Sequence, residues 1–416
     1  MEAGDRVRIT RDDHELEGVL LPSTTDEHLV IKRDGGYNVG IARESASVDV
    51  IDQATVSIDQ TEPVTGETST VHVDDGLPTV SLLSTGGTIA STVDYRTGAV
   101  SPRFDVEDVL QIVPELRGRA NYRGCAISNI LSENMRPEIW QDLAEAIADE
   151  IEAGADGVVV MHGTDTMQYT ASAIAFMLDT PVPIVFTGSQ RSADRPSSDN
   201  VMNAVCAVEA ATADVGEVLV CMHAGTSDDV CALHRGTRVR KNHTSKRSAF
   251  ETVGEVPIGT VTYPDGKLTW APNKDRVGRG ETELAVDTEL ETDVELLTFA
   301  PGADPDRVRA CSDRAGLVIA GTGLGHVNEG WLAAIRELPD DLPVVMTSQC
   351  LDGRVCDRVY ETGRDLLGAG VIEAEDTLPE TALVKLMWAL ANGEDVREAM
   401  SRSIAGEISP ASRPWS

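Results

Sequence analysis

The strongest constraint on the fold is an alternation of apolar strands and amphipathic helices that begins at residue 78. Four apolar segments have the length of strands, and each ends in small or polar residues: 79–84, 157–163, 183–189 and 217–223. Residues 137–153 have the period of an amphipathic helix, with Pro137 near its start and Gly154 just after its end. Such alternation predicts a parallel sheet with helices on both faces. We therefore expect an α/β domain over residues 78–274.

A second, smaller α/β domain is predicted after a charged connector at residues 275–292. The strand pattern resumes in three apolar segments, 294–300, 316–325 and 343–350. A long apolar helix is expected at residues 381–391. The smaller domain and a tail are expected to occupy residues 293–416.

The amino-terminal part has a different pattern. Residues 4–51 contain five short segments with alternating polarity, separated by turns rich in Asp, Gly, Pro and Thr. Five short strands in so few residues predict a small, partly open β-barrel over residues 1–56. A polar stretch rich in Thr and Asp follows, and we interpret residues 57–77 as a linker.

The charge composition indicates the salt concentration to which the protein is adapted. The chain has 69 acidic residues and 35 Lys and Arg residues, so its formal net charge is −34. In dilute buffer such a surface repels itself, whereas at about 1 M salt the Debye length is only roughly 3 Å. The composition is typical of proteins from a salt-rich cytoplasm, as in halophiles. It also disfavours nucleic-acid binding by the whole surface, because phosphate affinity comes from clustered Lys and Arg.

Other compositional features narrow the class of protein. No stretch approaches the roughly 18 apolar residues of a membrane span, and the first residues carry no apolar signal region. We expect a soluble, cytoplasmic protein. The seven cysteines are scattered without a C-x-x-C pair, so neither a disulfide framework nor a metal site is predicted.

One local cluster of cations departs from the acidic composition. Residues 235–247 contain Arg235, Arg238, Arg240, Lys241, Lys246 and Arg247. The cluster could form a surface that faces a binding partner. Alternatively, it is a solvated loop from which only one lysine turns inward, since charge runs are usually solvated.

Two loops with hydroxyl groups follow strands of the predicted sheet. The first is TGGT at residues 85–88, and the second is HGTDT at residues 162–166. If the two strands are neighbours, Thr88, Thr164 and Asp165 converge at the carboxyl edge of the sheet. A Thr hydroxyl becomes a nucleophile only with a base, which Lys241 or Lys246 could supply. His162, the first residue of the second motif, lies at the strand end and is expected to be packed.

Two simpler interpretations of these loops remain open. Thr164 and Asp165 could cap the helix that follows, because both residue types are good N-caps and an acid suits the helix dipole. The TGGT turn could hold a phosphate, but the chain lacks the G-x-G-x-x-G and G-K-[ST] patterns of nucleotide sites.

Four ordered motifs resemble the type I and II L-asparaginases and their amidohydrolase relatives. They are STGGTIAS, HGTDTM, TGSQRS followed by SSDNVMNAV, and VRKNHT. The resemblance covers residues 78–400. It implies a flavodoxin-like large α/β domain, a smaller carboxyl-terminal α/β domain, and hydrolysis of a side-chain carboxamide to an acid and ammonia.

The resemblance also implies roles for individual residues. Thr88 matches the nucleophile, whereas Thr164, Asp165 and Lys241 match the second hydroxyl, its carboxylate and the base. Tyr95 matches a tyrosine that assists the first Thr, and Ser132 matches the residue that holds the α-groups of the substrate. Glu133 stands where asparaginases usually have Gln, which leaves the substrate preference open. Two further positions are expected to bind or assist the substrate: Gly163 and Ser189.

The amino-terminal segments GDRVRI, EGVLLP and LVIKRDGGYNVGI resemble the D-type subunits of the archaeal glutamyl-tRNA(Gln) amidotransferases, as do VYETGRDLL and PETALVKLMWAL. With the acidic composition, this points to a haloarchaeal member. The resemblance implies that the chain hydrolyses L-glutamine and passes ammonia to an E-type subunit, which activates Glu-tRNA(Gln) with ATP and Mg. It implies no cofactor in this chain, tRNA bound mainly by the partner, and a homodimer core in a heterotetramer. On this interpretation the cations of residues 235–247 could face the partner or the tRNA. We expect the barrel to dock the partner.

Two other functions remain possible from the sequence. One is a stand-alone L-asparaginase or glutaminase with an unrelated barrel. The other is a scaffold built on an inactive amidohydrolase fold, which the intact Thr88, Thr164, Asp165 and Lys241 make unfavourable.

Overall fold

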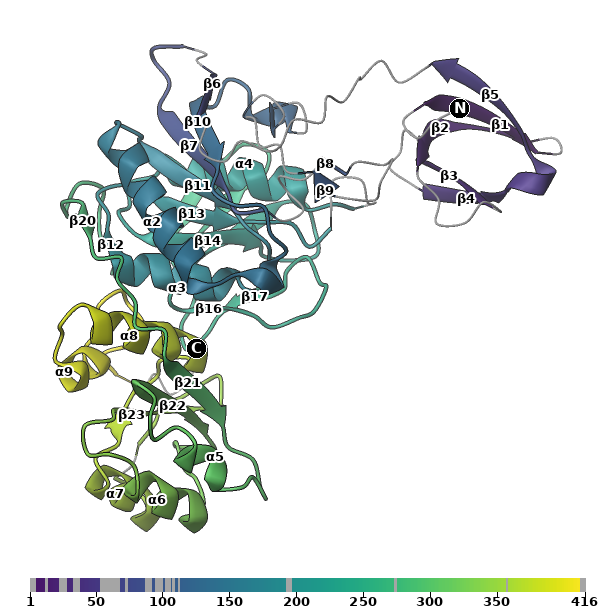
Figure 1. Cartoon of the computed structure of the whole chain (residues 1–416). Helices are drawn as coiled ribbons and strands as arrows, with labels where there is room; N and C mark the ends of the chain where they lie inside the picture. Colours follow the sequence, from purple (N-terminus) through teal and green to yellow (C-terminus); the bar gives the residue numbers. More distant parts are fainter. Residues whose placement is uncertain are drawn as a thin grey trace.

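Three sheets and their helices make up most of the structure, a computed structural model (Figure 1). The structure describes residues 5–11, 14–21, 28–32, 38–52, 68–71, 74–86, 92–93, 100–101, 106, 109–110, 113–191, 197–272, 275–356 and 358–411.

The largest sheet has nine strands in the order β19-β18-β15-β14-β13-β11-β7-β10-β6. Its five consecutive strands from β14 to β10 are parallel, whereas β6, β15, β18 and β19 run antiparallel to their neighbours. The strands are β6 (Ser69–Val71), β7 (Thr79–Ser84), β10 (Asn121–Ala126), β11 (Gly157–Met161), β13 (Ile184–Thr187), β14 (Val218–His223), β15 (Val230–Arg235), β18 (Gly259–Thr262) and β19 (Leu268–Trp270). The parallel arrangement predicted from the apolar segments is confirmed for the central strands only.

Helices cover both faces of this sheet, as predicted. Helices α2 (Pro137–Glu152) and α3 (Met167–Met177) share one apolar core with the sheet, and α4 (Asn200–Ala211) contributes to the core on the other face. The predicted face of α2 is buried through Ile139, Leu143 and Ile147.

A four-stranded parallel sheet, β21-β22-β23-β24, forms the smaller α/β unit. Helices α5 to α7 pack into the core on one face, and α8 and α9 into the core on the other. Helix α8 also packs against α3, where Trp388 stacks on Phe176 with ring centroids 6.3 Å apart. The elements are β21 (Val294–Thr298), β22 (Gly316–Gly321), β23 (Val344–Ser348), β24 (Ile372–Glu373), α5 (Asp306–Arg309), α6 (Glu329–Arg336), α7 (Glu361–Gly368), α8 (Pro379–Ala391) and α9 (Val396–Ser401).

The amino-terminal unit is an antiparallel sheet in the order β4-β3-β2-β1-β5. The sheet curls on itself (Figure 1). Its core consists of six buried aliphatic side chains: Val7, Ile9, Leu20, Leu29, Ile31 and Ile41. The elements are β1 (Arg6–Arg11), β2 (His14–Leu21), β3 (His28–Lys32), β4 (Asn38–Ala42), η1 (Arg43–Ser45) and β5 (Ser47–Asp52). Because β4 and β5 end the order, the unit matches the predicted small, partly open barrel.

Short elements complete the described structure: β8 (Thr92–Val93), β9 (Val100–Ser101), η2 (Pro114–Leu116), η3 (Ser132–Asn134), β12 (Leu178–Asp179), β16 (Val239–Lys241), β17 (Phe250–Thr252) and β20 (Ala285–Val286). Strand β6 lies within the predicted linker of residues 57–77 and adds to the edge of the large sheet. Similarly, β20 lies in the predicted connector of residues 275–292 and pairs with β12. Strands of two or three residues are too short to show an alternation in the sequence, so neither was predicted. The predicted domain boundaries themselves stay predictions.

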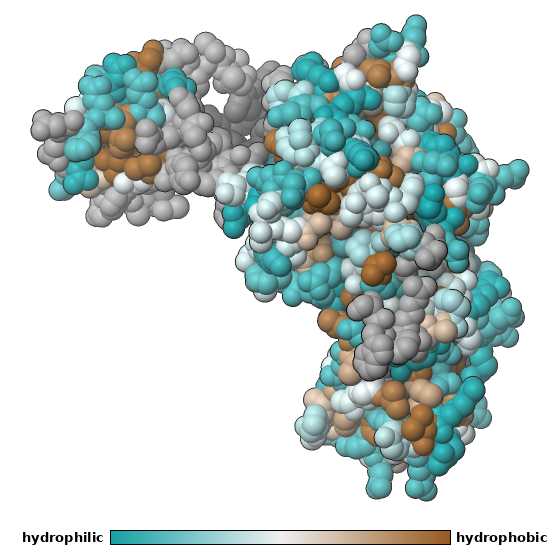
Figure 2. All heavy atoms as spheres, turned by 180° about the vertical axis from the view of Figure 1, so that it is seen from behind, coloured by the Kyte–Doolittle hydropathy of each residue, from teal (hydrophilic) through white to brown (hydrophobic). Residues whose placement is uncertain are grey.

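The surface agrees with the acidic composition. Hydrophilic residues cover most of the described surface in the rear view, and hydrophobic ones occur in small groups (Figure 2). No helix in the described ranges is long and apolar enough to cross a membrane. All seven cysteines are free thiols.

Candidate active site

The two hydroxyl loops follow neighbouring strands, as the sequence analysis predicted. Strand β11 pairs in parallel with β7, so the loops after Ser84 and Met161 leave the same edge of the sheet. From β7 the chain passes to β10 on one side and then to β11 on the other. Such a reversal of strand order opens a crevice at the carboxyl edge, where ligands bind in α/β sheets.

Lys241 reaches this edge from the end of β16. Its Nζ donates a hydrogen bond to Oγ1 of Thr164 at 2.8 Å and lies 2.6 Å from Oδ1 of Asp165. The Lys241 side chain is only 9% exposed, whereas that of Asp165 is 65% exposed. Lys246 is exposed. The structure therefore selects Lys241 as the lysine that meets the motif.

Helix capping does not account for Thr164 and Asp165. Helix α3 begins at Met167, its N-cap residue is Thr166, and no side chain caps it. The Thr166 hydroxyl instead donates to the Ser132 carbonyl at 2.8 Å. The capping interpretation is wrong because the chain makes an additional turn between the strand and the helix.

Ser132 lies against this turn, at the start of η3. Its side chain is buried, and its Oγ is 3.5 Å from Oδ2 of Asp165, a long contact. Glu133, the next residue, is exposed. A Cβ atom on Gly163 would stand 2.6 Å from Cβ of Ser132, so only glycine fits at this position. The predicted roles of Ser132, Glu133 and Gly163 in substrate binding stay predictions.

Substitution of Gly163 by Ala is expected to lower the free energy of unfolding by about 1–3 kcal/mol, because the added methyl group overpacks the contact with Ser132. Urea unfolding in high-KCl buffer measures this change. Gly225→Ala is the matched control, since a Cβ there would meet no atom within 4 Å. Equal effects of the two substitutions would contradict the prediction.

Ser189 holds the loop after β13 rather than the turn of Thr164. Its buried hydroxyl donates to Oδ1 of Asp199 at 3.0 Å and to the carbonyl of Arg191. The fully buried Asp199 also accepts backbone N–H groups of Gln190 and Arg191. The predicted assisting role of Ser189 stays a prediction.

His162 is packed, as predicted. Its ring is buried, meets Phe186 edge-on, and has Nδ1 2.6 Å from the Gly163 carbonyl. Burial lowers its pKa to about 4. The imidazole is consequently neutral at physiological pH.

The first hydroxyl loop is described as far as Gly86. The N–H of Thr85 donates to the Met161 carbonyl at 3.1 Å and joins the loop to β11. Gly86 has a φ of +105°, and a Cβ on it would lie 2.5 Å from the Ile130 carbonyl oxygen. Thr88 and Tyr95 lie outside the described residues, so their predicted roles stay predictions.

Gln168, in the first turn of α3, also contacts the strand of Lys241 and was not predicted from the sequence. Its side chain is buried, and its Oε1 accepts the Lys241 N–H at 3.4 Å. The signal was available, because a Gln in the apolar helix segment MQYTASAIAF requires a polar partner when buried.

The cation cluster of residues 235–247 is only partly the solvated loop that the sequence suggested: residues 242–246 are exposed and Lys241 turns inward, but the arginines are paired. Each of its arginines has an acidic partner: Arg235 pairs with Glu217, Arg238 with Asp376, Arg240 with Glu380 and Arg247 with Asp228. Arg238 is only 1% exposed. Both interpretations offered by the sequence are wrong for Arg238, because its side chain is buried. Its partner Asp376 lies 138 residues away in the sequence, so no local pattern indicates the pair.

Comparisons with known proteins agree with this fold. Residues 79–274 match the family described as "Asparaginase, N-terminal", and residues 293–401 match "Glutaminase/Asparaginase C-terminal domain". The thermostable L-asparaginase from Thermococcus kodakarensis superposes with a TM-score of 0.71 at 34% identity, over 80% of this chain and 100% of that chain. L-asparaginase I from Vibrio cholerae gives 0.69 at 27% identity, with the same coverage. The fold and the site thus define a protein of the asparaginase class.

The full-length comparisons are more specific. Residues 1–51 match the "GatD N-terminal domain". The D-type subunit of the glutamyl-tRNA(Gln) amidotransferase from Halobacterium salinarum is 62% identical over 100% of this chain and 99% of its own length. The proteins of the same name from Haloquadratum walsbyi and Methanosarcina mazei are 61% and 51% identical, over 99% and 97% of both chains. The chain belongs to the family of D-type glutamyl-tRNA(Gln) amidotransferase subunits, and its haloarchaeal relatives agree with the halophilic composition.

Proposed function

We propose that this chain is the glutaminase subunit of a tRNA-dependent amidotransferase that converts Glu-tRNA(Gln) to Gln-tRNA(Gln). The observation that carries the hydrolytic part is the contact of Lys241 with both Thr164 and Asp165 at the carboxyl edge of the sheet. The full-length identity to the D-type subunits supports the amidotransferase part.

The proposed chemistry is covalent hydrolysis of the L-glutamine side chain. The Thr88 hydroxyl attacks the amide carbon, the C–N bond breaks, and ammonia leaves with a proton. The resulting ester on Thr88 is then attacked by water, which regenerates Thr88 and releases glutamate. Two half-reactions of this kind are typical of an activated hydroxyl nucleophile.

Lys241 and Thr164 act as the proton carrier in both half-reactions. The Thr164 hydroxyl accepts a hydrogen bond from Lys241 Nζ, so its own proton is free to point toward a reacting group. Asp165 holds the Lys241 side chain from the other side. Proton transfer by a positioned group typically contributes about 10²- to 10⁴-fold to rate.

The remaining parts of the proposal concern partners. Ammonia passes to the E-type subunit, which uses ATP and Mg to activate the glutamyl group, so this chain needs no cofactor. The net charge of −34 and the paired arginines of residues 235–247 support tRNA binding mainly by the partner. We place this reaction in the cytoplasm, in a heterotetramer around a homodimer core.

A stand-alone L-asparaginase or glutaminase is the second candidate, because the T. kodakarensis enzyme matches over all of its own chain. Ammonia release from glutamine and asparagine distinguishes the two, measured in high-KCl buffer with Thr88→Ala as control. Slow turnover of glutamine that rises when the partner protein and Glu-tRNA(Gln) are added is expected. Fast turnover without them would instead support the free amidohydrolase.

A further inference from the structure

The strand that carries Lys241 is held by the smaller α/β unit and by the carboxyl-terminal segment 403–410. Thr237, just before β16, donates its hydroxyl to the Ala405 carbonyl at 2.9 Å. The Thr237 carbonyl accepts the Thr381 hydroxyl at 3.2 Å, and Thr381 lies in α8. The hydroxyl and the carbonyl of Thr237 therefore both form hydrogen bonds with elements outside the large sheet.

Arg238 makes the strongest of these connections. Its guanidinium has two contacts of 3.1 Å with Oδ2 of Asp376 and donates to Oγ of Ser409 at 2.8 Å. Its Nε donates to the Gly406 carbonyl at 3.1 Å. Such a buried, multiply bonded guanidinium fixes the backbone at the start of β16.

The next polar contact lies directly beside Lys241. Nε of Arg240 is 3.4 Å from Oε1 of Glu380, in the first turn of α8, without a hydrogen bond to that oxygen. Glu380 is buried, and burial raises the pKa of its carboxyl. Successive side chains of a strand point to opposite faces. Arg240 can therefore contact α8 while Lys241 contacts Thr164 and Asp165.

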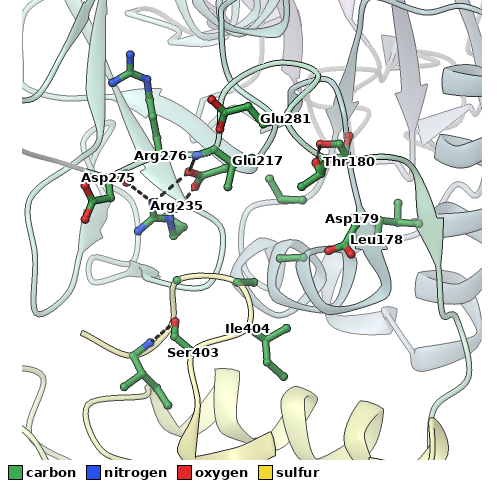
Figure 3. A pocket seen from close by; sticks show the side chains of 18 of the residues that line it. Leu178, Asp179, Thr180, Glu217, Arg235, Asp275, Arg276, Glu281, Ser403 and Ile404 are labelled. Atoms are coloured by element: carbon green, nitrogen blue, oxygen red, sulfur yellow. Dashed lines mark hydrogen bonds and ion pairs between the residues drawn. The ribbon is translucent and has the colours of Figure 1, made fainter. Parts of the chain in front are cut away.

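Segment 403–410, which binds Thr237 and Arg238, also borders a cavity. Its residues Ser403, Ile404, Ala405 and Gly406 line a cavity of about 480 Å³ that faces Arg235 and Glu217 (Figure 3). The cavity lies at the start of β14, at the edge opposite Thr164. The contacts of Thr237 and Arg238 fix the start of β16, and the contact of Arg240 with α8 adds a further attachment next to Lys241.

We propose that Arg240 and Glu380 are positioning residues that set where Lys241 stands relative to Thr164 and Asp165. The smaller α/β unit thereby controls the geometry of the proton carrier through Glu380. The inference rests on the proposed role of Lys241. A displacement of about 1 Å can cost roughly 10²-fold in rate, so loss of this pair is expected to lower kcat markedly.

The test compares Glu380→Gln, Arg240→Gln and the double variant in the full-length chain. Each single substitution is expected to lower kcat for glutamine hydrolysis roughly 10-fold or more while KM stays at the parent value. Arg240→Lys, which keeps the cation, is expected to restore part of kcat. The double variant is expected to lose no more than the single variants, because residues of one pair are not additive.

The matched control is Glu150→Gln, which alters the Arg123–Glu150 pair of the large domain, with side chains exposed by only 21% and 12%. Equal kcat losses for Glu150→Gln and Glu380→Gln, or an unchanged kcat in Glu380→Gln, would overturn the inference.

A further variant, Lys241→Met, separates the failure of the positioning role from the failure of the proposed function. If it keeps parental turnover, the proposed function fails; if it is inactive while Glu380→Gln has parental kcat, only the positioning role fails.

Discussion

Replacement of Lys241 by Met is expected to lower kcat for glutamine hydrolysis by about 10²- to 10⁴-fold, the usual contribution of a positioned proton carrier. Met keeps most of the length of the side chain but can neither donate to Thr164 nor carry a proton. The measurement is steady-state ammonia release in high-KCl buffer, with the partner protein and Glu-tRNA(Gln) present.

The loss should come from chemistry and not from unfolding. Asp165 is 65% exposed, so water can solvate its carboxylate once the lysine is gone. Because the carboxylate that is left behind is exposed, the substitution buries no unpaired charge, and Lys241→Met should therefore unfold close to the parental urea concentration.

Lys246→Met is the matched control, since it removes the other lysine of the same segment from an exposed position. It is expected to leave kcat at the parental value. The proposed proton carrier would be refuted by a Lys241→Met variant that keeps parental kcat, or by equal losses in the two variants.

The sequence predicted those features that depend on local patterns. The bounds of β7, β11 and β14 follow runs of apolar residues, and the turn at Thr164 and Asp165 follows from polar residues at a strand end. Their convergence with Lys241 could be expected from the motifs and the rules of parallel sheets.

Features that depend on distant residues could not be predicted in the same way. Arg238 stands in a run of cations that looks solvated, yet it is buried against Asp376 and the carboxyl-terminal segment. The antiparallel strands β15 and β18 likewise form a meander after β14, and the polarity of their residues follows no clear period along the sequence. Charge pairs between residues far apart in the sequence, and strands of only a few residues, cannot be recognised from a short stretch of sequence.

Removal of the Glu407 carboxylate is expected to have the largest effect on stability. Glu407 and Lys385 are both 0% exposed, and their Oε1 and Nζ atoms are 2.5 Å apart. Burial lowers the pKa of Lys385, although the Glu407 carboxylate opposes this shift. Glu407→Ala would leave the ammonium group buried without its partner, which should cost about 3–5 kcal/mol.

Backbone contacts add to this expectation. The Glu407 carboxylate accepts the N–H groups of Ile404 and Ala405, and Lys385 donates to the Arg402 carbonyl at 2.6 Å. The ion pair therefore fixes segment 403–410, which forms hydrogen bonds with Thr237 and Arg238. Urea unfolding of the full-length chain in high-KCl buffer measures the change in the free energy of unfolding.

Two further variants show whether the buried charge is the cause. Glu337→Ala breaks an exposed pair with Arg309 and is expected to leave the free energy of unfolding close to that of the parent. Lys385→Met combined with Glu407→Leu removes both charges and should recover much of the loss, because apolar replacements of a buried pair are often tolerated. A Glu407→Ala variant as stable as Glu337→Ala would show that water reaches Lys385, and the carboxyl-terminal segment would then be held by its backbone contacts and by Arg238.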